Sequence, residues 1–216
     1  MPTGSPVSRS RIRSTRLGSG RLILVTGGTR SGKSRFAVEL AKQFGRRIAY
    51  LATCRPGADT EMRQRIARHR RARPASWRTI EGPAELPRAI TQLNGTLDGA
   101  IIDCLTMYVS DRLIRGDSDA VIQQQVRRLC RAIRQASYPV VMVTNEVGSS
   151  VVPEHELGRR FRDLAGLANQ LAAGCADDVF LLVAGIPVPV KGNADSRGSS
   201  TCKNTPPKGG AFLRSP

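Results

Sequence analysis

Residues 25–34, VTGGTRSGKS, combine the residue types that bind phosphate. Gly27, Gly32, Lys33 and Ser34 stand at the G-x-x-x-x-G-K-[ST] spacing. Glycines let successive backbone N–H groups turn toward a phosphate, the lysine reaches the β and γ phosphates, and the hydroxyl can ligate Mg²⁺. An apolar run precedes the motif and an amphipathic run follows it. The sequence predicts a nucleotide-binding loop, and the alternative is a glycine-rich turn with an incidental lysine.

Asp103 is a candidate for the carboxylate that such a loop needs to hold its metal. It ends the apolar run in GAIIDCLT, residues 99–106. P-loop enzymes usually place this carboxylate at the end of a neighbouring strand, and open α/β sheets bind ligands at the carboxyl edge. Alternatively, Asp103 caps a helix that begins near Leu105, and both roles can coexist.

His69 lies among five arginines in RIARHRRARPASW, residues 65–77, of a chain with two histidines. At helical spacing from Met62 and Ile66, it fits the edge of an apolar stripe. The arginines favour a second interpretation, because cations disfavour imidazolium and arginine forks bind polyphosphate. A neutral imidazole beside a triphosphate can attack phosphorus and form a phosphoramidate. The residues alone leave both interpretations open.

The candidate site residues can act together only if the fold places them at the same edge of a sheet. Apolar runs alternate with amphipathic stretches of helical length, which predicts a parallel sheet covered by helices. The fold class expected is α/β, similar to P-loop NTPases, with a mostly parallel sheet flanked by helices on both faces. The expected strands are 22–26, 47–53, 99–103, 139–144 and 179–184, and the expected helices are 34–44, 59–71, 83–93, 118–136 and 154–173.

Length and composition predict one folded domain with two extensions. The chain has 216 residues, 40% of them hydrophobic, which suits a single core. Both ends are rich in Ser, Gly, Pro and Thr without apolar periodicity, as disordered segments are. We expect a disordered basic extension over 1–20, a P-loop domain over 21–191 and a disordered tail over 192–216.

Cysteine usage and hydropathy predict a cytoplasmic protein. The five cysteines are an odd number without a C-x-x-C pair, so neither a disulfide framework nor a zinc site is expected. No apolar run approaches the roughly 18 residues that span a bilayer, and the first residues lack the apolar core of a secretory signal. No membrane partner is therefore expected.

The net charge of +17 raises the rival hypothesis of a nucleic-acid-binding module. Residues 1–20 contribute +4 and residues 191–216 another +4, which leaves +9 for the middle of the chain. Aromatic residues make up 4% of the chain, and no RRM, zinc-finger or KH signature occurs, so nucleic acid is not an expected partner. A G-protein switch is not expected either, because TNEV at 144–147 does not match N-K-x-D.

Six blocks occur in an order typical of one enzyme family. They are LVTGGTRSGKSRFA, YLATCRPG, EMRQRIARHRRARPASWRTIE, IIDCLT, VTNEVGSSVVPEHELGRRFRDLAGLANQLAA and DDVFLLVAG, spread over about residues 21–191. The chain resembles the bifunctional adenosylcobinamide kinase / adenosylcobinamide-phosphate guanylyltransferase family of cobalamin biosynthesis. The resemblance implies two reactions: an NTP phosphorylates adenosylcobinamide, and GTP then converts adenosylcobinamide phosphate to adenosylcobinamide-GDP with release of pyrophosphate. The rival within this fold is a P-loop kinase or NTPase without guanylyl transfer.

The resemblance also implies roles for individual residues. The histidine of the family's H-[RK] pair accepts GMP from GTP, and His69 occupies its place. The expected catalytic residues are His69 and Lys33, and Ser34 and Asp103 are the expected Mg²⁺ ligands. The expected contacts to GTP and ATP are Thr26, Gly27, Gly28, Thr29, Arg30, Ser31, Gly32, Lys33, Ser34, Ala52, Thr53, Cys54, Arg70, Arg71, Ala72, Arg73, Glu81 and Asp103.

The sequence departs from the family pattern at two positions. Many relatives read N-E-V-G-x-G, whereas Ser150 stands here in place of the second glycine and can strain a backbone position that needs φ > 0. Arg68 occupies the first position of many relatives' histidine pair, so no second histidine is available as a nucleophile. The family forms homotrimers with active sites near subunit boundaries, and we expect the same here.

Four other features have simpler interpretations. We expect His155 to be solvated, Trp77 to pack rather than stack on a base, and Cys54 and Cys104 to be small core residues. The arginines at 159, 160 and 162 form either an exposed charged face or part of the substrate cleft.

Overall fold

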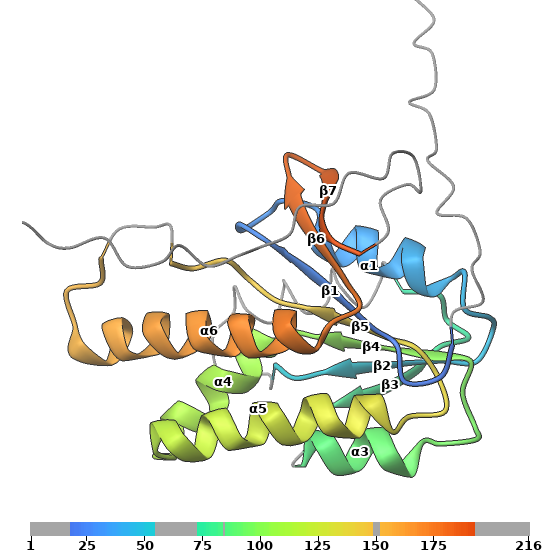
Figure 1. Ribbon diagram of the computed structural model, residues 1–216, viewed down its shortest axis with the longest axis horizontal. Coiled ribbons are helices and arrows are strands. Elements are labelled where there is room, and N and C mark those ends of the chain that lie inside the picture. The colour runs from blue at the N-terminus through green and yellow to red at the C-terminus, as the bar shows by residue number, and fades with distance from the viewer. Residues whose placement is uncertain (1–17, 55–72, 84, 149–151, 193–216) are drawn as a thin grey trace, which may run out of the picture.

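The computed structural model describes residues 18–54, 73–83, 85–148 and 152–192 (Figure 1). Helices and strands alternate along most of the chain. Their order is β1 (Leu22–Gly27), α1 (Lys33–Ala41), β2 (Ile48–Ala52), β3 (Arg78–Glu81), α3 (Leu86–Gln92), β4 (Gly99–Asp103), α4 (Leu105–Ile114), α5 (Asp119–Arg134), β5 (Val140–Val143), α6 (Glu156–Cys175), β6 (Asp178–Val183) and β7 (Ile186–Lys191).

The described strands form one sheet in the order β3-β2-β4-β5-β1-β6-β7. All neighbouring pairs are parallel except β6 and β7, which are antiparallel. Strand β1 lies between β5 and β6, and β4 lies beside β5, so the end of β4 is close to the loop that follows β1. The predicted α/β class with a mostly parallel sheet is confirmed.

Helices cover both faces of the sheet, which explains why its central strands are apolar throughout. Helix α1 packs on one face, against side chains such as Ile23 and Val25. Helices α3, α4, α5 and α6 pack on the other, against side chains such as Leu22 and Leu24. Figure 1 shows α1 on the opposite side of the sheet from α3, α5 and α6.

Helix α5 shows how the sequence sets its own boundaries. The Ser118 hydroxyl accepts a hydrogen bond from the Val121 N–H, as an N-cap does. Asp119 lies in the first turn, while Arg131 and Arg134 lie in the last, so both ends complement the helix dipole. The helix predicted over 118–136 is present over Asp119–Arg134, with Ser118 as its N-cap.

The five predicted strands are all present, and the structure adds two edge strands. Strand β3 is mostly exposed, and β7 contains Pro187 and Pro189. Proline cannot donate to a sheet ladder and is tolerated at edges, so neither segment has the apolar pattern of a buried strand. The strand expected to reach Ala184 ends at Val183, because Ala184 (φ 49°) and Gly185 (φ 85°) form the turn of the β6–β7 hairpin.

Several predicted segments lie outside the described residues. These are the helix at 59–71 and most of the two basic extensions. Among the helices that the structure describes, none has the length and apolar character needed to cross a membrane.

Candidate nucleotide and metal site

The loop between β1 and α1 adopts a conformation that requires its glycines. Gly27 has φ 148°, and a Cβ there would lie 2.5 Å from the carbonyl oxygen of Leu182. Gly32 has φ 95° and is the N-cap of α1. Both conformations are open to glycine and strained for other residues. The predicted loop therefore leads directly into a helix N-terminus, where backbone N–H groups and the helix dipole attract anions.

Lys33 lies within this loop rather than extending into solvent. Its side chain is buried, and its Nζ donates to the Gly28 carbonyl at 2.6 Å and to the Ser31 hydroxyl at 3.4 Å. The ammonium group is thus held beside the backbone that would surround a phosphate chain.

Ser34 and Asp103 meet at the carboxyl edge of the sheet. The Ser34 Oγ lies 3.5 Å from the Asp103 Oδ2. A hydroxyl and a carboxylate are the hard oxygen donors that Mg²⁺ accepts, usually together with substrate phosphates and few protein ligands. Among the described residues, no three or more His, Cys, Asp or Glu side chains lie together in a way that could hold a metal ion. The donors present fit Mg²⁺.

The alternative role of Asp103 as a helix cap is wrong. The N-cap of α4 is Cys104, the residue after Asp103. Asp103 instead uses its backbone carbonyl to accept from the Thr53 N–H at 2.9 Å. The Thr53 hydroxyl accepts from the Cys104 N–H at 2.8 Å and donates to the Cys104 carbonyl at 2.7 Å. These bonds hold Thr53, and with it the end of β2, beside Asp103.

Tyr50 is a site residue that the sequence analysis missed. Its hydroxyl donates to the Asp103 Oδ2, and the Arg73 guanidinium carbon lies 3.6 Å from its ring centroid. Burial, followed by the charge of Asp103, raises the pKa of the Tyr50 phenol, so the group is a neutral donor at neutral pH. Within IAYLA, Tyr50 has the pattern of an ordinary core residue, and the spacing gives no signal of its role.

Of the two cysteines near the site, Cys104 has the surroundings of a core residue. Cys104 is buried, its sulfur lies 3.2 Å from the Thr106 hydroxyl, and burial raises the pKa of its thiol to about 11. Cys54 is half-buried and not disulfide-bonded. Trp77 is also buried and packs in the cluster beneath α1, as predicted.

Thr26, within β1, has its side chain on the opposite side of the sheet from α1. The side chain borders a pocket of about 350 Å³ against α6, and its Oγ1 is buried without a hydrogen-bond partner among the described residues. Neighbouring Glu146 also lines this pocket, and its N–H donates to the Gly27 carbonyl at 3.0 Å.

Of the residues between 70 and 81 predicted to contact the nucleotide, the structure describes Glu81 and Arg73 but not the rest. Glu81 lies at the end of edge strand β3, beside β2, where the Gly82 N–H donates to the Ala52 carbonyl at 2.8 Å. Arg73 reaches the site through Tyr50. The other predicted residues of that segment, His69, Arg70, Arg71 and Ala72, lie outside the described residues, as does Ser150.

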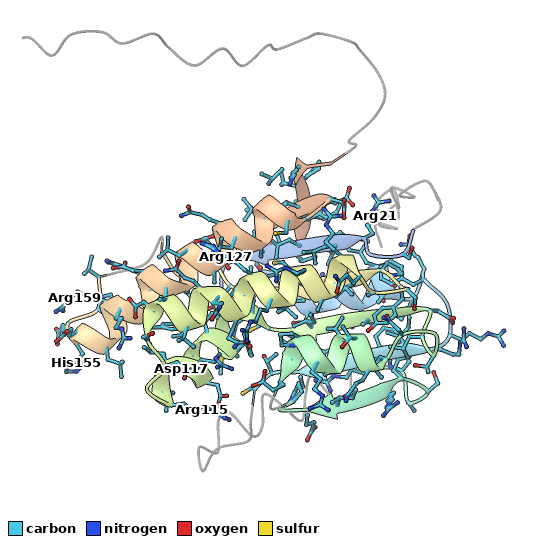
Figure 2. All side chains as sticks on the ribbon, turned by 60° about the horizontal axis from the view of Figure 1, so that its bottom comes forward. Arg21, Arg115, Asp117, Arg127, His155 and Arg159 are labelled. Atoms are coloured by element: carbon cyan, nitrogen blue, oxygen red, sulfur yellow. The ribbon has the colours of Figure 1, made fainter. Side chains whose placement is uncertain are left out.

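Two of the three arginines predicted to line the cleft or an exposed face, Arg160 and Arg162, pair with nearby acids. Arg160 binds Asp119 at the start of α5 at 2.6 Å, and Arg162 binds the adjacent Asp163 at 2.9 Å. His155 is exposed, as expected. Figure 2 shows His155 and Arg159 at the end of the molecule opposite Arg21, which precedes β1. The start of α6 therefore belongs to the end where the parallel strands finish.

Known proteins resemble this chain over most of its length. A family model described as cobinamide kinase / cobinamide phosphate guanyltransferase matches residues 23–190. The bifunctional adenosylcobalamin biosynthesis protein CobU of Salmonella typhimurium is 40% identical, covering 79% of this chain and 99% of the relative. The bifunctional protein CobP of Pseudomonas aeruginosa is 38% identical, covering 78% of this chain and 96% of the relative.

Among solved structures, a KaiC-like protein of Pyrococcus horikoshii OT3 gives a TM-score of 0.47 at 14% identity, covering 76% of this chain and 71% of that one. The family assignment rests on the matches in sequence. Since the family model spans residues 23–190 and the relatives match almost end to end, this chain belongs to the cobinamide kinase / cobinamide phosphate guanyltransferase family.

Proposed function

We propose that this chain catalyses two successive transfers on a corrinoid substrate. In the first, an NTP donates its γ-phosphoryl group to the aminopropanol hydroxyl of adenosylcobinamide. In the second, adenosylcobinamide phosphate receives GMP from GTP, which gives adenosylcobinamide-GDP and pyrophosphate. The family match over residues 23–190 supports both reactions. The observation that supports the site most directly is that Lys33 and Ser34 lie at the loop after β1 and that Asp103 lies beside Ser34.

In the kinase reaction, the loop positions the triphosphate. Backbone N–H groups at the start of α1 and the Lys33 ammonium bind the β and γ phosphates, and Ser34 and Asp103 would hold Mg²⁺. When bound there, the ion would supply positive charge to the phosphate oxygens. The substrate hydroxyl then attacks the γ phosphorus, and the bond to the β-phosphate oxygen breaks.

In the guanylyl transfer, His69 is the proposed nucleophile. Its imidazole attacks the α phosphorus of GTP, a P–N bond forms, and the P–O bond to pyrophosphate breaks. The phosphate of adenosylcobinamide phosphate then displaces the imidazole and completes the diphosphate. Lys33 stabilises the charge that develops on the leaving pyrophosphate. The arginine-rich sequence around His69 and the family's H-[RK] pattern support this assignment.

The decisive test is covalent labelling with GTP carrying a radioactive α phosphate. The pure protein and its His69→Ala variant are incubated with Mg²⁺ and the labelled GTP, then denatured. We expect label on the wild type alone, stable in alkali and lost in acid, as a phosphoramidate is. Absence of label from wild-type protein that still binds GTP would leave only a kinase or NTPase.

The proposal also includes the cellular compartment, the assembly and the metal. We place the reaction in the cytoplasm and assign a homotrimeric assembly, with Mg²⁺ as the metal. The four cysteines that the structure describes are not disulfide-bonded, as suits a reducing compartment. Light scattering tests the assembly, and a single monomeric peak would contradict it.

A further inference from the structure

Tyr50 joins two charged groups of the site. Strand β2 pairs with β4 so that Ala52 is opposite Asp103 and Tyr50 is opposite Ile101. The Tyr50 ring lies on the α1 face of the sheet and is 2% exposed. From there, its hydroxyl reaches the Asp103 Oδ2, the same oxygen that lies 3.5 Å from the Ser34 Oγ. One carboxylate oxygen is therefore approached by two hydroxyl groups from two different elements.

The face of the same ring supports a cation. The Arg73 guanidinium carbon lies 3.6 Å from the ring centroid, within the range of a cation–π contact. Nε and Nη1 of Arg73 are buried and have no hydrogen-bond partner among the described residues. A planar guanidinium held by stacking keeps its donors in a fixed fork, which suits binding of a phosphate or carboxylate.

An ordinary core tyrosine does not account for this arrangement. Tyr138 offers the comparison within the same chain, because it is 1% exposed and its hydroxyl donates to the Ile90 carbonyl at 2.6 Å. That bond satisfies one buried hydroxyl with a backbone group. The Tyr50 hydroxyl instead goes to the carboxylate beside Ser34, while its ring supports an arginine.

We propose that Tyr50 is a positioning residue, whose hydroxyl orients Asp103 toward the metal and whose ring holds the Arg73 guanidinium in place for the nucleotide. The proposal rests on the proposed function, because it assigns Tyr50 to the metal and nucleotide site of that reaction. The two halves of the side chain have separate roles, and they can be removed separately.

The test uses two variants and a matched control in the full-length protein. Tyr50→Phe removes the hydroxyl and keeps the stacking surface, whereas Tyr50→Leu removes both. Tyr138→Phe removes a buried hydroxyl of the same kind on the other face of the sheet. Two affinities are measured: Mn²⁺ by electron paramagnetic resonance in the presence of a non-hydrolysable GTP analogue, and a fluorescent GTP analogue in EDTA.

Tyr50→Phe should weaken Mn²⁺ binding about tenfold, because Asp103 loses a hydrogen bond to a charged acceptor. Its affinity for the analogue in EDTA should match the wild type. Tyr50→Leu should show the same loss for Mn²⁺ and, in addition, bind the analogue in EDTA at least threefold more weakly. Tyr138→Phe should leave both affinities unchanged.

Each result that differs from these expectations contradicts a particular part of the proposal. Wild-type Mn²⁺ affinity in Tyr50→Phe would overturn the role of the hydroxyl, and wild-type affinity in EDTA for Tyr50→Leu would overturn the role of the ring. Equal losses in Tyr50→Phe and Tyr138→Phe would assign the effect to general core damage. Failure of GMP labelling in the wild type is a separate result, because the two affinities are measured without turnover.

Discussion

At the scale of single residues, the site depends on contacts that range from local to distant in sequence. Lys33 binds Gly28, five residues away, so spacing alone predicts that they share a loop. Asp103 is 69 residues from Ser34, and the sequence predicts their contact only through the rule that parallel strands finish at one edge. Tyr50 was missed because its contact with Asp103 depends on the pairing of β2 with β4, which residue spacing does not reveal.

Asp103→Asn tests the proposed role of Asp103 as a Mg²⁺ ligand. The amide keeps the size of the side chain but removes the charge that Mg²⁺ requires, so both the kinase rate and the rate of GMP labelling should fall by about 100-fold or more. Affinity for the GTP analogue in EDTA should change less than threefold. Rates measured across a range of Mg²⁺ concentrations check this, and normal rates at low Mg²⁺ would contradict the assignment.

Asp98 gives a pH-dependent prediction away from the site. Its carboxylate accepts from the N–H groups of Arg46 and Arg47 and from the Arg47 guanidinium, with the shortest contact at 2.6 Å. The guanidinium contact, then the backbone bonds, lower the pKa of Asp98 to about 2. The unfolded value is near 3.9, so this stabilisation is present above about pH 4 and is lost as the pH falls to about 2.

The measurement is the thermal midpoint of wild type and Asp98→Asn between pH 2 and pH 6. The variant should be less stable at pH 6, and the two curves should converge as the pH approaches 2. Glu39→Gln, which removes an exposed partner of Lys42, reports the effect of losing a surface carboxylate. A constant gap between wild type and Asp98→Asn over the whole range would show that the ion pair does not cause it.

At the scale of elements, the buried strands are predictable and the edge strands are not. VVMV in β5 is fully buried, and an apolar run of that length admits few other interpretations. Strand β7 forms by pairing with the edge of β6. Its own sequence, IPVPVK, lacks the pattern of a strand, so it could not be predicted without knowing that β6 lies beside it. The omission matters for function, because the Gly185 N–H in the β6–β7 turn donates to the Ser31 carbonyl of the phosphate loop at 3.0 Å.

The β6–β7 turn predicts a pair of stability changes of opposite sign. Ala184 and Gly185 both have positive φ, as in a type I′ turn, where Asn-Gly is preferred. Ala184→Asn should raise the free energy of unfolding by about 0.5 kcal/mol, since asparagine tolerates this conformation better than alanine. Gly185→Ala should lower it by about 1–2 kcal/mol, the cost of a left-handed residue with a Cβ. Urea unfolding with unchanged m-values checks both, and two changes of the same sign would refute the turn assignment.

At the scale of the whole molecule, the positive charge is denser in the two terminal extensions than in the part of the chain that carries the proposed site. The family match spans residues 23–190, whereas a large share of the positive charge lies beyond it. Residues 1–17 carry +4 and residues 193–216 carry +3 of the total +17, which leaves +10 for residues 18–192. Composition therefore raises a nucleic-acid hypothesis that the positions of the charges weaken.

Removal of residues 1–17 and 193–216 tests whether the charge of the extensions contributes to DNA binding or to the proposed reactions. Non-specific binding to nucleic acid depends on the number of phosphates neutralised, with a slope in log salt of about 0.9 per contact. The shortened chain should therefore bind duplex DNA more weakly and with a shallower salt dependence than the full chain. Its rates of phosphorylation and GMP labelling should stay within about twofold, because the phosphate loop, Asp103 and His69 are all retained. If labelling disappeared while the shortened chain kept its unfolding transition, the extensions would belong to the catalytic unit, and the charge would have a function in the reaction itself.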